Sequence, residues 1–192
     1  MSRFTHLLAG LACAFAAFAA PASAYEIDPL TREPIVPFQN LIPQATAIPR
    51  EVVSFQGRYA PGTIVISTIE RRLYFVLGNG QAIRYGVGVG RPGFDWAGTK
   101  LVTRKAEWPT WTPPAEMLRR RPDLPRFMKG GPDNPMGARA MYLGSTLYRI
   151  HGSNEPDTIG QAVSSGCIRM MNEDVVDLYE RVRVGTRVVV QR

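Results

Sequence analysis

The hydrophobic positions of the chain beyond Gly57 fall in short runs that are rich in β-branched and aromatic residues. Two such runs cover residues 63–69 and 72–77, and a third covers residues 81–89 after a Gly-Asn-Gly turn at residues 78–80. Short runs of this composition, bounded by glycine and polar residues, are typical of β-strands joined by tight turns. The pattern therefore predicts a β-meander.

A second group of hydrophobic runs lies in the C-terminal half of the chain. Residues 140–143 and 146–150 predict another strand pair, and residues 186–191 predict a closing strand. Helical periodicity occurs at residues 172–182, where Asn172 is a candidate N-cap and acidic residues fill the first turn. The apolar face of this helix consists of Val175, Val176, Tyr179 and Val182. The sequence thus predicts a mostly β fold with one main helix.

Two proline-rich segments interrupt the hydrophobic pattern. Residues 25–50 contain five prolines and no apolar periodicity, which indicates an extended arm or linker, with a strand-like strap on the domain as the alternative. Residues 108–135 contain seven prolines and predict a long surface excursion of the kind that forms functional lids or walls. The basic run at residues 119–121 within it favours a solvated face.

The N-terminus has the layout of a secretory signal. Arg3 precedes a 14-residue apolar run at residues 7–20, and Ala22-Ser23-Ala24 provides a small-x-small cleavage site. A retained membrane anchor is disfavoured because this run is shorter than the ~20 residues that a spanning helix needs. We therefore expect a signal peptide at residues 1–24, an arm at 25–56, a domain at 57–192, a periplasmic location and no integral membrane span after cleavage.

Cleavage changes the composition in an informative way. The chain has 192 residues and a formal charge of +7, and the part beyond residue 24 carries +6, one cysteine, Cys167, and one histidine, His151. One cysteine excludes a disulfide scaffold, and one Cys with one His leaves a metal site short of ligands, so no metal is expected. The positive charge suits an anionic wall polymer, whereas export argues against nucleic acid as a partner.

Residues 86–90, Gly-Val-Gly-Val-Gly, lack the third glycine and the following helix of a dinucleotide-binding motif. Small residues within a strand explain this run better. No cofactor is therefore expected.

The remaining cysteine and histidine each stand in a polar, glycine-flanked segment. Cys167 follows Gly166 shortly before the predicted helix, whose amide groups would favour the thiolate and so lower the pKa of the thiol. The amides of Gly166 or Cys167 could hold an oxyanion, and His151 could act as the base. The alternative is a buried structural cysteine and a hydrogen-bonded histidine that never meet. The position of both residues in polar loops favours catalysis.

The order and spacing of these residues distinguish the classes of cysteine enzyme. Papain-like enzymes place Cys before His, caspase-like enzymes place His much further upstream, and sortases have a wider His–Cys gap. His151-Gly152 followed by Ser164-Ser165-Gly166-Cys167-Ile168-Arg169 instead resembles the signature of the L,D-transpeptidase (YkuD-type) catalytic domain. The resemblance extends over residues 57–190. One departure is Ser165, which stands where many members have a second histidine.

This resemblance implies a β-sandwich or mixed-sheet catalytic domain that acts on peptidoglycan stem peptides. It implies that Cys167 attacks the carbonyl of the third stem residue of a donor tetrapeptide, expels D-Ala and forms a thioester that an acceptor amine resolves into a 3→3 cross-link. His151 would be the general base and then the acid, and the Gly152 carbonyl would orient it. Expected substrate-binding residues are Ser164, Ser165 and Arg169, although a structural salt bridge is an equal alternative for Arg169.

The sequence leaves several alternatives to cross-linking open. Release of the acyl group by water would make the protein an L,D-carboxypeptidase or amide hydrolase, and an outer-membrane protein could replace the stem peptide as acceptor. A wall-binding module without catalysis is the competing class. The intact Cys167–His151 pair argues against that class.

Overall fold

The computed structural model of the chain describes residues 26–27, 34–35 and 48–192, and these divide into two units. In the first unit, β1 (Glu26–Ile27) pairs antiparallel with β2 (Pro34–Ile35). The expected signal peptide at residues 1–24 lies outside the described residues. Within the described part of the chain, no helix is long and apolar enough to cross a membrane.

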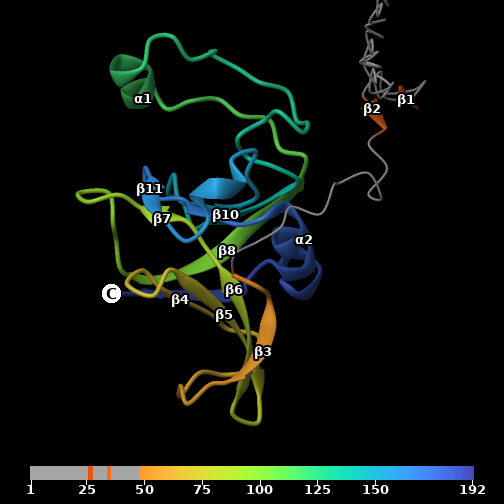
Figure 1. The fold of residues 1–192 in the computed structure, drawn as a ribbon, viewed down its shortest axis with the longest axis vertical. Helices are drawn as coiled ribbons and strands as arrows, with labels where there is room; N and C mark the ends of the chain where they lie inside the picture. Colours follow the sequence, from red (N-terminus) through yellow and green to blue (C-terminus); the bar gives the residue numbers. More distant parts are fainter. Residues whose placement is uncertain (1–25, 28–33, 36–47) are drawn as a thin grey trace, which may run out of the picture. The chain divides into compact units, whose positions relative to one another are not determined.

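The second unit is built on a mixed nine-stranded sheet (Figure 1). In spatial order its strands are β12 (Ile168–Arg169), β10 (Arg149–His151), β9 (Arg139–Leu143), β8 (Gly98–Glu107), β13 (Arg187–Gln191), β4 (Ile64–Ser67), β5 (Arg72–Gly78), β6 (Gln81–Gly86) and β3 (Glu51–Ser54). The β10–β12 and β13–β4 pairs are parallel, and the other pairs are antiparallel. A separate parallel pair joins β7 (Val89–Gly90) to β11 (Ala162–Ser164).

Strand β8 joins the two halves of this sheet. Residues 98–101 pair with β13, whereas residues 102–107 pair with β9, and the register shifts between Val102 and Arg104. Such irregularities bend a strand and let it pass from one sheet layer to the other. One hydrophobic core accordingly draws on both halves; among its members are Ile64, Leu73, Tyr85, Met141, Ile150 and Ile168.

Helix α2 (Asn172–Arg181) packs against β9 and contributes Val175 and Leu178 to the core. The expected N-cap is wrong, because Asn172 is the first helical residue and its side chain makes no cap hydrogen bond. The buried Asn172 amide instead accepts from the Ala138 N–H at 2.9 Å and donates to the Ser153 carbonyl at 3.0 Å. A side chain that joins two distant loops in this way serves tertiary structure rather than the helix end.

The structure confirms the mostly β fold, the β4–β5–β6 meander, the β9–β10 pair and the closing strand β13. It adds the short helix α1 (Ala115–Arg120) and the 3₁₀ helix η2 (Pro156–Thr158). It also places β3, from the segment assigned to the arm, at the sheet edge, where it pairs antiparallel with β6. Because β3 is mostly exposed, its sequence lacks the hydrophobic run of a buried strand.

Candidate active site

The parallel pairing of β10 with β12 brings the predicted site residues together. Ile150 lies opposite Ile168 and His151 lies opposite Arg169, and both isoleucines are buried in the core. Since side chains alternate between the two faces of a sheet, the residues flanking each isoleucine project from the other face. These four residues are Arg149, His151, Cys167 and Arg169.

This face opens into a cavity of about 470 Å³. The residues of its strand side include Leu147, Arg149, His151, Ser164, Ser165, Cys167 and Arg169. The opposite wall comes from the proline-rich excursion at residues 108–135, and includes Trp111, Met117, Arg120, Arg121, Leu124 and Met128. The excursion is therefore a wall of the cavity. Two arginines of the basic run, expected on a solvated face, line it as well.

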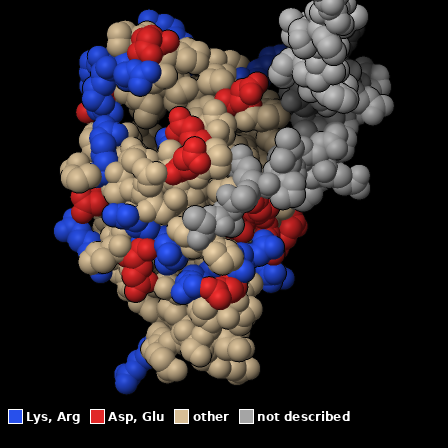
Figure 2. Space-filling view, in the orientation of Figure 1, with Lys and Arg blue, Asp and Glu red and all other residues tan. Residues whose placement is uncertain are grey.

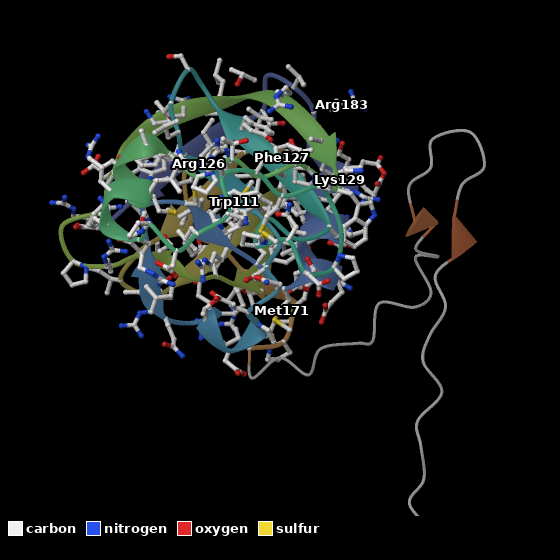
Figure 3. The ribbon with its side chains drawn as sticks, turned by 90° about the horizontal axis from the view of Figure 1, so that it is seen from above. Trp111, Arg126, Phe127, Lys129, Met171 and Arg183 are labelled. Atoms are coloured by element: carbon white, nitrogen blue, oxygen red, sulfur yellow. The ribbon has the colours of Figure 1, made fainter. Side chains whose placement is uncertain are left out.

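The excursion closes on itself through a backbone bridge. The amide groups of Trp111 and Met128 donate to each other's carbonyl oxygens at 2.9 and 2.8 Å. Figure 3 shows Trp111, Arg126, Phe127 and Lys129 in the same part of the molecule. Figure 2 shows Lys and Arg side chains gathered around α1 together with acidic side chains, so this wall carries charges of both signs.

His151 is buried, and its ring is held by the adjacent residue. Nδ1 lies 2.6 Å from the carbonyl oxygen of Gly152, the group expected to orient the ring. A carbonyl only accepts, so Nδ1 carries the proton and Nε2 is the unprotonated nitrogen of the neutral ring. Burial, reinforced by the charge of Arg169, lowers the pKa of His151 to about 4. The imidazole is therefore neutral at physiological pH and able to accept a proton.

Cys167 is a half-buried free cysteine whose thiol donates to the Leu147 carbonyl at 3.6 Å. Burial raises the pKa of this thiol, against the opposing positive charge of Arg149. The expectation that a helix start activates the thiol is wrong, because β12 separates Cys167 from α2, which begins at Asn172. The resting site thus holds a neutral thiol, directed to the Leu147 carbonyl, and a neutral imidazole in the same cavity rather than an ion pair.

The turn before Cys167 is held by Ser164. The buried Ser164 hydroxyl donates to the Cys167 carbonyl at 2.6 Å and accepts from the Gly166 amide at 3.1 Å. The Gly166 amide, expected as an oxyanion donor, is therefore already engaged within the turn. Ser164, expected to bind substrate, has its hydroxyl occupied by the same turn. Of the two expected oxyanion donors, the Cys167 amide remains the candidate.

Two other expected substrate-binding residues also contact the protein itself. Ser165 lines the cavity and accepts a hydrogen bond of 3.3 Å from Arg91. Arg169 forms a salt bridge of 2.6 Å with Glu155 and donates to Thr158 at 3.3 Å. The salt-bridge alternative for Arg169 is thus the contact that the structure contains.

Arg149 is a cavity residue that the sequence pattern did not single out. Its Nη1 donates to the Leu147 carbonyl at 3.1 Å, the same oxygen that accepts from Cys167. The available signal was its position two residues before His151 in a predicted strand, which places both side chains on one face. The partner strand that brings Arg149 beside Cys167 was not apparent, because β12 contains only two residues.

A comparison with protein families matches residues 61–190 to YkuD, the L,D-transpeptidase catalytic domain. The chain belongs to this family. "Probable L,D-transpeptidase YbiS" of Escherichia coli K12 is 46% identical over 134 residues, a stretch that makes up 65% of this chain and 43% of that protein. The chain therefore matches less than half the length of this relative.

Solved structures of similar fold extend the comparison. An L,D-transpeptidase from Mycobacterium smegmatis has a TM-score of 0.56 at 18% identity, over 69% of this chain and 59% of that one, and so shares the fold. A Brucella melitensis structure titled as a probable carnitine operon oxidoreductase, caia, is 46% identical with a TM-score of 0.52, over 77% of this chain and 96% of that one.

Residues 86–90 run from the end of β6 through β7 and are followed by a turn and then β8, which differs from the strand–turn–helix unit that cradles a dinucleotide phosphate. Over the described residues, no three His, Cys, Asp or Glu side chains lie close enough to hold a metal ion.

Proposed function

We propose that this chain is an exported L,D-transpeptidase that forms 3→3 cross-links between peptidoglycan stem peptides through a thioester on Cys167. The observation that carries the proposal is the placement of Cys167 and His151 on one face of β10 and β12, within one cavity. Membership of the YkuD family supports the reaction class. A cavity of about 470 Å³ lies within the usual range for sites that bind small ligands.

Acylation begins from the neutral pair. Nε2 of His151 accepts the thiol proton as Sγ of Cys167 attacks the carbonyl carbon of the third stem residue. The carbonyl oxygen becomes an oxyanion, to which the Cys167 amide donates. The C–N bond then breaks, the imidazolium returns its proton to the departing D-Ala amine, and a thioester remains. Because both groups start neutral, proton transfer accompanies attack instead of preceding it.

Deacylation repeats these steps with an incoming amine. His151 accepts a proton from the acceptor amine as the amine nitrogen attacks the thioester carbonyl. The C–S bond breaks, an amide forms, and the imidazolium returns the proton to sulfur. The Gly152 carbonyl keeps the ring in the required tautomer throughout, since its contact with Nδ1 leaves Nε2 for the thiol.

The partners follow from this reaction and from charge. The donor is a stem tetrapeptide and the acceptor is the side-chain amine of a second stem. The charge of +6 beyond residue 24 favours association with the carboxylate-rich wall polymer. Export rests on the N-terminal apolar run, and protein recovered from the periplasm should begin at or near Tyr25. Full-length protein fixed in the inner membrane would contradict this.

The reaction is tested by incubating the purified protein with a disaccharide-tetrapeptide and analysing the products by mass spectrometry. We expect a dimer lighter than two substrates by one D-Ala, and a protein adduct on Cys167 that lacks D-Ala. Cys167→Ala should abolish both, whereas Arg104→Gln, on the exposed surface of β8, should retain them. Tripeptide and D-Ala without dimer would indicate an L,D-carboxypeptidase, and dimer formed by Cys167→Ala would exclude the mechanism. Added outer-membrane protein tests the tethering alternative.

A further inference from the structure

Arg149 differs from the other arginines that line the cavity. Four arginines line it, and three of them have a carboxylate partner: Arg120 with Glu116 at 3.1 Å, Arg121 with Asp123 at 2.6 Å, and Arg169 with Glu155 at 2.6 Å. Among the described residues, no carboxylate lies within the 4.0 Å salt-bridge distance of Arg149. Its guanidinium contacts the Leu147 carbonyl at 3.1 Å and the Tyr142 ring at 5.3 Å from the ring centroid.

The guanidinium of Arg149 also lies beside the reacting sulfur. The Leu147 carbonyl oxygen accepts from Arg149 Nη1 at 3.1 Å and from Cys167 Sγ at 3.6 Å, so the two side chains meet at one acceptor. A guanidinium has five N–H donors in a planar fork. The Leu147 carbonyl accepts one of them, and a side-chain hydrogen bond also joins the guanidinium to Cys167. The others are available to a bidentate acceptor in the cavity, for which a carboxylate is the best geometric match.

We propose that Arg149 binds the C-terminal carboxylate of the donor stem and so selects donors that end one residue beyond the scissile bond. The inference rests on the proposed function. In a tetrapeptide donor, the leaving nitrogen and the terminal carboxylate carbon are separated by two bonds of about 1.5 Å. When the scissile carbonyl contacts Sγ, this carboxylate therefore falls near the guanidinium. A donor with a further residue presents a neutral amide there instead.

Selection follows from the charge of the donor stem's C-terminal group, which lies beside Arg149. An arginine that faces a neutral amide loses the charge-assisted pair with a carboxylate. Its N–H groups are then left with weaker hydrogen bonds to neutral acceptor atoms. The same contact would hold the scissile carbonyl in place over the sulfur, so its benefit appears in acylation as well as in binding. Arg169 does not duplicate this role, since Glu155 already neutralises it.

The test compares two donors that differ only at the C-terminus: the disaccharide-tetrapeptide with its carboxylate, and the same molecule with a C-terminal carboxamide. Acylation rates at Cys167 are measured by intact-protein mass spectrometry for the native protein, Arg149→Gln, Arg149→Lys and Arg104→Gln. Arg104 is the matched control, because its guanidinium lies 3.6 Å from the centroid of the same Tyr142 ring but does not line the cavity.

We expect the native protein and Arg104→Gln to prefer the carboxylate donor by about 10- to 100-fold in kcat/KM. Arg149→Gln should lose this preference by slowing more with the carboxylate donor than with the carboxamide donor, because loss of the charge near Cys167 affects both donors while loss of the carboxylate contact affects one. Arg149→Lys should retain part of the preference. An equal loss with both donors, or no preference in the native protein, would overturn the inference while leaving the proposed function intact. If neither donor acylated Cys167 of the native protein, the result would contradict the proposed function and, with it, the inference.

Binding gives a readout that does not depend on turnover. The Cys167→Ala variant should bind the carboxylate donor more tightly than the carboxamide donor in a calorimetric titration. The double variant Cys167→Ala/Arg149→Gln should bind both equally. A preference that persisted in the double variant would assign carboxylate recognition to another residue and exclude Arg149.

Discussion

Nε1 of Trp96 donates a hydrogen bond of 2.8 Å to the carbonyl oxygen of Gly166, the residue that immediately precedes Cys167. The Trp96 indole is stacked on the Tyr148 ring, with centroids 4.5 Å apart and planes 7° apart. Tyr148 in turn packs directly against Gly166. The turn that presents the thiol is therefore supported by an aromatic pair on one side and by the Ser164 hydroxyl within it.

Replacing Trp96 by Phe should loosen this turn. The ring stacking is largely kept but the donor to the Gly166 carbonyl is lost, so we expect a stability loss of about 1 kcal/mol and a slower acylation of Cys167. Tyr148→Phe is the matched control, because it keeps the stacked ring and leaves the Trp96 hydrogen bond in place. Denaturant unfolding and acylation rates measure the two effects. Unchanged acylation in Trp96→Phe would show that the turn does not need this support.

Gly166 should tolerate no side chain. Its φ of +105° is unfavourable for other residues, and a Cβ at this position would lie 2.6 Å from the Tyr148 ring. Gly62 provides the control, since it also has a positive φ, +83°, but no atom lies within 4 Å of its added Cβ. Gly62→Ala should thus cost only backbone strain, about 1 kcal/mol, whereas Gly166→Ala should cost more and abolish acylation. Equal losses of stability in the two variants would contradict the packing argument.

The reactivity of the thiol should have its inflection at high pH. Burial raises the pKa of Cys167 above its ordinary value of about 8.5, and the charge of Arg149 opposes this. Alkylation by iodoacetamide, measured against pH, should therefore rise only above that value, and Arg149→Gln should move the inflection further up. An inflection well below 8.5 would instead support the lowered thiol pKa that the sequence predicts.

The chemistry of the site was more predictable from sequence than its electrostatics. Cys167 and His151 were identifiable because they are the only residues of their types beyond residue 24, and each lies in a polar glycine-containing segment. The neutral state of the pair was not, because it depends on how deeply the fold buries the two side chains. Arg149 was missed because its position beside Cys167 requires the parallel pairing of β10 with β12, which is not local in sequence.

The strands of the fold also divide into those that the sequence predicts and those that it does not. The meander was predictable because its strands are buried runs such as Ile64–Ser67. The ten-residue strand β8 was missed, since Val102 is its only fully buried residue and its other positions are largely polar. A strand with little apolar surface is held by hydrogen bonds to two neighbours, and a hydrophobic pattern does not record those bonds.

Two carboxylates of helix α2 have pKa values shifted in opposite directions. Asp174 is buried, one of its oxygens, Oδ2, has no hydrogen-bond partner among the described residues, and Arg50 lies 3.7 Å from the other. Burial raises its pKa to about 6. Above about pH 4 the unfolded chain loses this proton before the folded chain does, so folding stability falls as pH rises from about 4 to 6, and the loss persists at pH 7.

Asp174→Asn should therefore stabilise the protein at pH 7, by about 1–2 kcal/mol, and have little effect at pH 4. Asp177 is the control with the opposite sign. Tyr85 donates to it at 2.6 Å and Arg181 at 2.9 Å, and these contacts with Arg181 and Tyr85 lower its pKa even though burial opposes them. Asp177→Asn should consequently destabilise the protein at pH 7 and matter less as the carboxylate is protonated in acid. Urea unfolding of both variants at the two pH values measures this, and a stability loss at pH 7 in Asp174→Asn would show that the Arg50 contact outweighs the cost of burying the charge.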